Sequence, residues 1–103
     1  MRMKKRYEVI VSRRAEQMLL GHVGFLARVS VKAARRLRDA FAELLDELEE
    51  NPFQFPAADS PDLPDAYRKA LFGKRYQAIF CVDGEAVYLD AVLDCRMDNS
   101  DIL

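Results

Sequence analysis

Residues 73–97 constrain the fold of this chain more than any other stretch, because they predict a tight antiparallel hairpin. Asp83-Gly84 separates two runs that are rich in β-branched and aromatic residues. An Asp-Gly pair tolerates the positive φ angles that a two-residue hairpin loop requires. We therefore expect one strand over residues 75–82 and a second over residues 85–95.

The hairpin also predicts which side chains share a face, since successive residues of a strand point to opposite faces. One face is apolar and pairs Tyr76, Ala78, Phe80 and Val82 with Ala91, Leu89, Val87 and Glu85. The second face pairs Gln77, Ile79 and Cys81 with Asp90, Tyr88 and Ala86, and continues with Arg75, Asp94 and Arg96. We expect the second face to carry the chemistry. Apolar residues that this register turns outward should contact a partner: Phe72, Ile79, Tyr88 and Val92.

Local signals place one strand and two helices before the hairpin and a further strand directly ahead of it. Ser12 and Ser30 precede apolar stripes with helical spacing, and each hydroxyl can cap the first turn of a helix. Asn51-Pro52 ends the second helix, because the residue before a proline avoids the α region. The expected elements are a strand over 7–12, a helix from Ser12 to about Arg28, a helix over 31–50, a proline-marked loop to about residue 65, and a strand over 67–72.

This order predicts an α+β fold, β-α-α-β-β-β, in which a small antiparallel-rich sheet carries a two-helix hairpin on one face. A two-residue turn at Gly73-Lys74 would place Arg68 on the second face of the sheet. The same turn would place Lys69 on the apolar face, which conflicts with its charge.

Length and composition describe an ordinary globular chain. With 103 residues we expect a single domain over residues 1–103. The net charge of −1 hides an uneven distribution, with a basic start and acidic stretches over 43–50 and 94–101. No apolar run reaches the roughly 18–20 residues of a membrane span, so we expect a cytoplasmic protein without a membrane partner. The hairpin separates Cys81 from Cys95, and one histidine without a CxxC pair gives no basis for a metal or cofactor.

The order of the elements and several short motifs resemble the RelE/ParE superfamily of type II toxin–antitoxin toxins. The motifs are Asn51-Pro52 after the long helical hairpin, YR at 67–68, KRY at 74–76 and VLDCRMD at 92–98. The closing VLDCR is most similar to the proteins often labelled plasmid stabilisation proteins. The resemblance covers nearly the whole chain and implies a cognate antitoxin as partner.

The resemblance implies one of two targets. RelE-type toxins are RNA-binding endoribonucleases that cleave messenger RNA on the ribosome without metal, whereas ParE-type toxins act on DNA gyrase. It makes Arg68, Arg75 and Arg96 the candidate catalytic residues, as cations for the phosphorane charge. A ribosome-dependent endoribonuclease is the leading hypothesis. Gln77 at a position that is arginine in RelE, and the lack of a tyrosine after Arg96, favour a gyrase inhibitor or an inactive antitoxin-binding homologue.

Two further features have a structural and a functional interpretation. His22 lies on the apolar stripe of the first helix, and we expect a hydrogen-bonded structural histidine rather than a catalytic one. Lys32, Arg35, Arg36 and Arg38 near the start of the second helix are most simply a solvated face. They could also dock ribosomal RNA or an acidic antitoxin.

Overall fold

The computed structural model of the chain describes residues 6–58 and 66–96. Its elements follow the predicted order, β1 (Glu8–Val11), α1 (Arg13–Val29), α2 (Val31–Glu50), a 3-10 turn η1 (Pro52–Gln54), β2 (Tyr67–Phe72), β3 (Tyr76–Asp83) and β4 (Ala86–Asp94). The basic residues Lys4 and Lys5, the predicted loop beyond residue 58 and the tail after Arg96 lie outside the described residues. The predicted α+β fold is confirmed.

Both helices begin where the serine caps predict. The Ser12 hydroxyl accepts a hydrogen bond from the Ala15 N–H at 3.0 Å, and the Ser30 hydroxyl accepts one from the Ala33 N–H at 3.1 Å. These bonds satisfy donors that have no partner in the first turn of a helix. After α2, the Asn51 side chain accepts a bond from the Phe53 N–H and starts η1.

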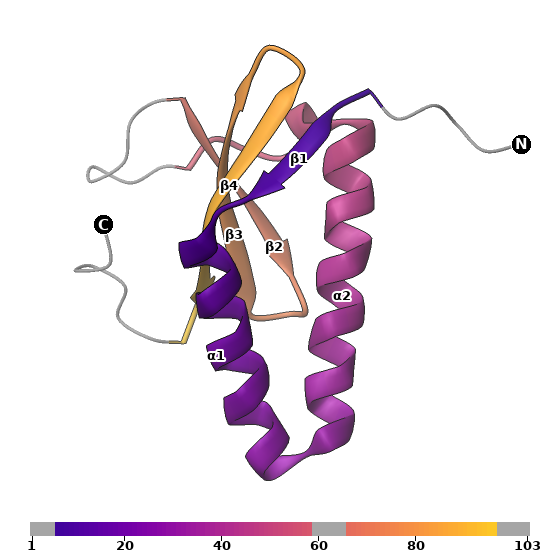
Figure 1. Ribbon diagram of the computed structural model, residues 1–103, viewed down its shortest axis with the longest axis vertical. Helices are drawn as coiled ribbons and strands as arrows, with labels where there is room; N and C mark the ends of the chain where they lie inside the picture. The colour runs from indigo at the N-terminus through magenta and orange to yellow at the C-terminus, as the bar shows by residue number, and fades with distance from the viewer. Residues whose placement is uncertain (1–5, 59–65, 97–103) are drawn as a thin grey trace, which may run out of the picture.

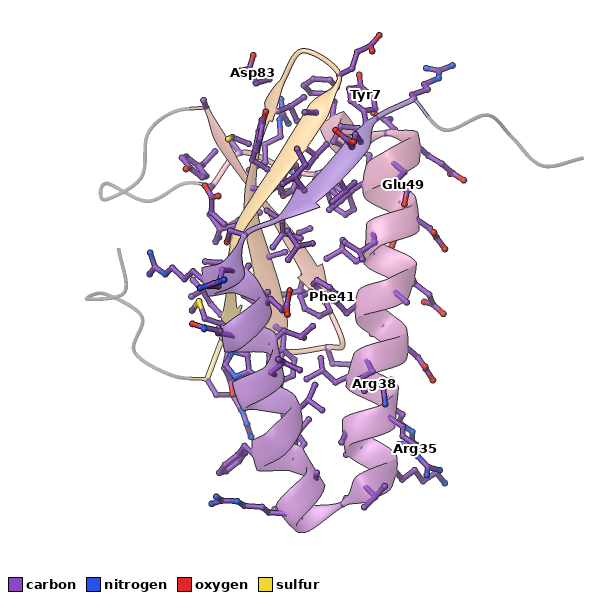
Figure 2. The ribbon with its side chains drawn as sticks, viewed as in Figure 1. Tyr7, Arg35, Arg38, Phe41, Glu49 and Asp83 are labelled. Atoms are coloured by element: carbon purple, nitrogen blue, oxygen red, sulfur yellow. The ribbon has the colours of Figure 1, made fainter. Side chains whose placement is uncertain are left out.

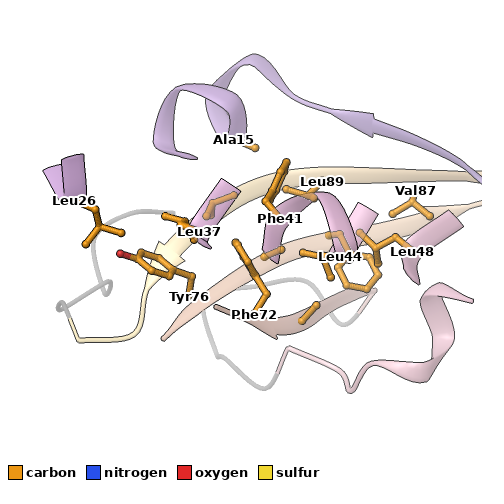
Figure 3. Close-up of a cluster of buried hydrophobic side chains, with 14 of the residues drawn as sticks. Ala15, Leu26, Leu37, Phe41, Leu44, Leu48, Phe72, Tyr76, Val87 and Leu89 are labelled. Atoms are coloured by element: carbon orange, nitrogen blue, oxygen red, sulfur yellow. The ribbon is translucent and has the colours of Figure 1, made fainter. Parts of the chain in front are cut away.

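The four strands form one sheet in the order β1-β4-β3-β2, in which β1 runs parallel to β4 and the other neighbours are antiparallel. The helical hairpin lies on one face of this sheet (Figure 1). The core lies between the layers, where apolar side chains of α2 meet those of the strands (Figure 3). Its fully buried residues include Leu44 and Leu48 from α2, Phe80 from β3 and Leu89 from β4.

The hairpin register differs from the prediction by a shift of its loop. Asp83 pairs with Ala86, so the loop residues are Gly84 and Glu85 rather than Asp83 and Gly84. Gly84 has a φ of 60°, and glycine with a positive φ at the first loop position is typical of a type II′ turn. The shift moves each partner by two residues, which keeps the predicted faces for Phe80, Val87 and Leu89.

A β-bulge changes the faces in the second half of β4. Phe80 pairs with Leu89 but Ile79 pairs with Ala91, which leaves Asp90 as the extra residue. Alternation is therefore reversed after Asp90, and Ala91 moves away from the helices while Asp94, paired with Tyr76, moves to the helical side. The prediction that Asp94 lies on the second face, together with Asp90, was wrong for this reason.

The register of β2 also differs. Phe72 pairs with Tyr76 across a three-residue loop, Gly73 to Arg75, in which Gly73 and Lys74 have φ angles of 57° and 73°. Arg68 consequently lies on the helical side, and the conflict over Lys69 disappears. Of the apolar residues expected to face outward, Tyr88 is 39% exposed, while Phe72, Ile79 and Val92 are buried. That part of the partner-contact prediction was wrong.

Helix α1 covers the part of the β4 edge that the short strand β1 leaves open. The Ser12 N–H donates to the Leu89 carbonyl at 3.0 Å, and the Ser12 hydroxyl donates to that of Asp90 at 3.3 Å. Farther along, His22 Nε2 donates to the Val92 carbonyl at 2.8 Å. His22 is thus the hydrogen-bonded structural residue that the sequence predicts. Its bond satisfies a backbone carbonyl at the edge of β4.

Candidate functional site

Arg68, the first predicted site residue, joins β2 to the segment that follows α2. Its Nη1 donates a hydrogen bond to the Phe55 carbonyl at 2.7 Å, and its guanidinium lies 5.0 Å from the centre of the Phe53 ring. The backbone of residues 56–58 runs alongside, with bonds from the Ala58 N–H to the Tyr67 carbonyl and from the Lys69 N–H to the Pro56 carbonyl. The contacts of Arg68 are those of a residue that holds a loop in place.

Arg75 and Arg96 lie at the opposite end of the sheet. The Cys95 N–H donates to the Arg75 carbonyl at 2.7 Å, which places the residues after β4 beside the loop between β2 and β3. The Arg75 guanidinium lies 5.8 Å from the centre of the Tyr76 ring. Arg96 is half exposed, and its Nη2 forms an ion pair with Asp94 Oδ2 at 3.1 Å.

Asp94 is buried and accepts its bonds mainly from Arg96. Asp94 Oδ1 accepts from the Arg96 backbone N–H at 2.9 Å and from Arg96 Nε at 3.3 Å. The side-chain bonds from Arg96, opposed in part by burial, hold the pKa of Asp94 below its ordinary value, and the bond to Asp94 raises the pKa of Arg96. The pair therefore keeps the negative charge of Asp94 next to Arg96, the predicted site residue that follows β4.

The structure therefore separates the three predicted cations into two groups. Arg68 pairs with Phe80, and Arg75 lies in the loop that begins after Phe72. At about 3.3 Å per residue along a strand, the two positions are roughly 15 Å or more apart. Arg75 and Arg96 come together, and Arg68 does not join them.

A cavity opens next to Arg75, between the end of the helical hairpin and the loop that joins β2 to β3. It has a volume of about 290 Å³ and a mainly apolar lining. Its lining residues are Leu26, Ala33, Arg36, Leu37, Gly73, Lys74, Arg75 and Tyr76. Three of these residues are cationic, so the cavity combines apolar and positively charged lining residues.

Exposed cations of α2 extend this positive surface. We define the basic end as Lys32, Arg35, Arg36 and Arg38 of α2 together with Lys74 and Arg75 of the loop. The sequence shows the α2 run but does not indicate that Lys74 and Arg75 lie beside it. The Lys-Arg pair directly after a glycine was the available signal, because a tight turn projects its side chains away from the sheet.

A polar cluster on the face away from the helices surrounds the bulge. The Tyr67 hydroxyl donates a short hydrogen bond to Asp90 Oδ2, and this bond, more than burial, raises the pKa of Tyr67 to about 12. Burial, followed by the charge of Asp90, raises the pKa of the Cys81 thiol. Both groups stay protonated near neutral pH, so neither supplies a base or a thiolate nucleophile.

Both cysteines are free. Within residues 6–58 and 66–96, no three His, Cys, Asp or Glu side chains are grouped so that they could hold a metal ion. Among the same residues no helix is long and apolar enough to cross a membrane.

Comparison with known proteins gives a family match across most of the chain. Residues 9–99 match the family described as the ParE toxin of the type II toxin–antitoxin system parDE. A solved structure titled the chromosomal ParDE TA system from P. aeruginosa is similar with a TM-score of 0.70 and 16% sequence identity, covering 86% of this chain and 96% of that one. At that identity the likeness concerns the fold. No curated protein sequence matches.

Proposed function

This chain belongs to the ParE toxin family of type II toxin–antitoxin systems, and from that premise we propose that it arrests growth by binding and inhibiting DNA gyrase. In this proposal the toxin acts in the cytoplasm without cleaving nucleic acid. A cognate antitoxin holds it inactive, as befits the toxin of a type II system.

The observation that carries this proposal is the separation of the predicted cations. Cleavage of RNA without a metal requires a base, an acid and a cation around one phosphate. Arg68 donates to the Phe55 carbonyl at 2.7 Å and Arg96 is paired with Asp94, so two of the three candidates already have partners within the chain. Tyr67 and Cys81, the titratable groups around the bulge, have raised pKa values and remain protonated. This arrangement suits a protein that acts by binding.

A ribosome-dependent endoribonuclease is the second candidate function. The observation in its favour is that Arg75 and Arg96 meet at one end of the sheet, near Lys74 and Arg36. A phosphate bound there would meet several cationic groups, and arginine offers it a fork of two donors.

The two candidates differ in what the purified protein does to gyrase and to messenger RNA. We expect the protein to inhibit DNA supercoiling by gyrase in vitro and to leave messenger RNA intact when expressed in cells. We also expect Arg96→Ala to remain toxic, because Arg96 contacts Asp94 of its own chain. Arg13→Ala, a change at an exposed arginine at the start of α1, is the matched control.

If messenger RNA is cleaved, and if growth arrest is relieved by Arg96→Ala but not by Arg13→Ala, the proposal of gyrase inhibition is rejected. The protein is then a ribosome-dependent endoribonuclease. A protein that inhibits neither process yet binds its antitoxin would be the inactive homologue.

A further inference from the structure

Basic residues gather in the first half of α2 and acidic residues in its second half, which is the order that the dipole of the helix backbone disfavours. The first half carries Lys32, Arg35, Arg36 and Arg38 with one carboxylate, Asp39, and the charged residues of the second half are all acidic, Glu43, Asp46, Glu47, Glu49 and Glu50. The first turn contains no acidic residue and the last turn no basic one. Because the N-terminus of a helix bears partial positive charge, this order does not stabilise the helix. It places positive side-chain charge at one end of α2 and negative side-chain charge at the other (Figure 2).

No side chain of the basic end forms an ion pair with a carboxylate among the described residues, although, besides the bonds from Arg96, the charge of Arg75 helps to lower the pKa of Asp94. The ion pair between Arg96 and Asp94 lies beside these cations, but none of the six side chains of the basic end is itself in such a pair. Asp39 is exposed on the same stretch of α2 and likewise forms no ion pair with a described residue. The charges of the four cations of α2 and of Lys74 are thus available to a partner.

The shape of the basic end favours a uniformly charged polymer over an acidic polypeptide. Arg35 projects from α2 away from the sheet (Figure 2) and Arg38 is also exposed, so much of the charge lies on a convex helix rather than inside the cavity. Lys32, Arg35 and Arg38 follow one another at three-residue steps along the helix, a rise of about 4.5 Å each, and Arg36 lies next to Arg35 in the sequence. The phosphates of a nucleic-acid backbone offer closely and regularly spaced negative charges to these cations. An acidic peptide offers separate carboxylates, each of which must lie opposite a cation.

We propose that the basic end binds the phosphate backbone of duplex DNA, without reading its sequence, and that the acidic half of α2 turns the molecule so that this end faces the DNA. The inference rests on the proposed function, because gyrase holds duplex DNA and would present it to a bound toxin. The toxin then binds the enzyme–DNA complex more tightly than the enzyme alone.

Fluorescence anisotropy of the purified full chain with a labelled 20-bp duplex tests this proposal. Neutralising phosphates releases counterions, so affinity should fall steeply between 50 and 200 mM salt. The double variant Arg35→Ala/Arg38→Ala should bind roughly tenfold more weakly at 50 mM salt, and the slope of log K against log salt should be smaller by about 2. Alanine is the best helix former, so the variant keeps α2 intact.

The matched control is Arg6→Ala/Arg13→Ala, which removes the same charge from exposed positions outside the basic end. Equal DNA binding by the two double variants would overturn the proposal. The proposal would also be overturned if the Arg35/Arg38 double variant bound the antitoxin more weakly but bound DNA as well as the wild type. That result would identify the antitoxin as the partner of the basic end.

The same variants with gyrase separate this inference from the proposed function. If both double variants inhibit gyrase equally, with and without DNA, the contact with DNA is rejected and gyrase inhibition stands. If the wild-type chain binds DNA through the basic end but leaves gyrase active, the DNA contact stands and gyrase inhibition is rejected.

Discussion

Replacing Arg68 should destabilise the fold rather than remove a catalytic group. Arg68→Ala deletes a 2.7 Å hydrogen bond from a charged donor to the Phe55 carbonyl and the stacking of the guanidinium on Phe53. A hydrogen bond to a charged group contributes about 1.5–3 kcal/mol, and a cation–π contact at a partly exposed site about 0.5–1 kcal/mol. Allowing for solvation of the half-buried carbonyl, we expect a loss of about 2 kcal/mol in the free energy of unfolding.

Urea unfolding of the purified protein measures this change. With a slope of about 1.3 kcal/mol/M, typical of a small domain, the midpoint should fall by about 1.5 M without a change of slope. Arg68→Lys should recover only part of the loss, because lysine keeps the charge but not the planar donor group. Arg75→Ala is the control: the Arg75 side chain stacks at 5.8 Å on Tyr76 with no side-chain hydrogen bond within the described residues, so its midpoint should change by less than about 0.5 M.

An unchanged midpoint in Arg68→Ala, together with lost toxicity, would refute this reasoning and return Arg68 to the functional site. A large midpoint shift with toxicity that recovers at lower temperature would support it, since a destabilised but intact site works once the chain is folded.

Three further predictions concern other named contacts. Asp94→Asn should lower stability at pH 7, and the difference from the wild type should shrink as the pH falls below 3.8. Arg96 holds the pKa of the Asp94 carboxylate below that ordinary value, so the carboxylate contributes its full stability above 3.8 and loses it as the pH falls through the lowered pKa. Thermal unfolding at a series of pH values measures this. Gly73→Ala should cost about 1–2 kcal/mol more than Gly84→Ala in urea unfolding, because both have positive φ but only at Gly73 would a Cβ meet another side chain at 3.3 Å. In an ultraviolet titration the Tyr67 hydroxyl should ionise near pH 12. A pKa near 10 would show that its hydrogen bond to Asp90 does not form in solution.

The helices could be predicted from sequence because their signals are local. Ser12 and Ser30 bond to N–H groups three residues later, and Asn51-Pro52 stops α2 through the conformation of a single residue. The predicted span of α2 and that of β2 agree with the structure at both ends. Such contacts depend only on neighbours in the chain.

The strand registers could not be predicted in the same way, because distant contacts decide them. The bulge at Asp90 is held by Ser12 across 78 positions and by Tyr67 across 23. Alternation of apolar residues does not reveal a bulge when the residues on both sides of it are apolar, as Leu89 and Ala91 are. The faces of the residues beyond Asp90, and with them the position of Asp94, follow from those contacts.

The predicted site failed to converge for a related reason. The resemblance makes Arg68 a candidate beside Arg96, and a two-residue turn would place both on the outer face, whereas the three loop residues turn Arg68 toward the helices. On that side Arg68 donates a hydrogen bond to the Phe55 carbonyl, 13 positions earlier in the chain. Similarity to a family identifies the position of a cation but not its partner, which depends on the register of β2.

The final prediction separates stability from function at the start of α2. Lys32 lies in the first helical turn, where its charge opposes the helix dipole. Lys32→Glu removes that repulsion and adds an attraction of similar size, so the free energy of unfolding should rise by about 0.5–1.5 kcal/mol. The same change should weaken DNA binding, because the basic end then carries a carboxylate.

Glu50→Lys is its counterpart at the last residue of α2. It also aligns a side-chain charge with the dipole and should stabilise by a similar amount, yet it lies outside the basic end and should not weaken DNA binding. Urea unfolding and DNA anisotropy on both variants give four results. If Lys32→Glu binds DNA as well as Glu50→Lys does, the charge order of α2 has no part in DNA binding. If stability falls in Lys32→Glu, the dipole argument itself is wrong. A gain in stability at both ends with a loss of DNA affinity only at Lys32 would show that α2 retains an unfavourable charge for the sake of binding.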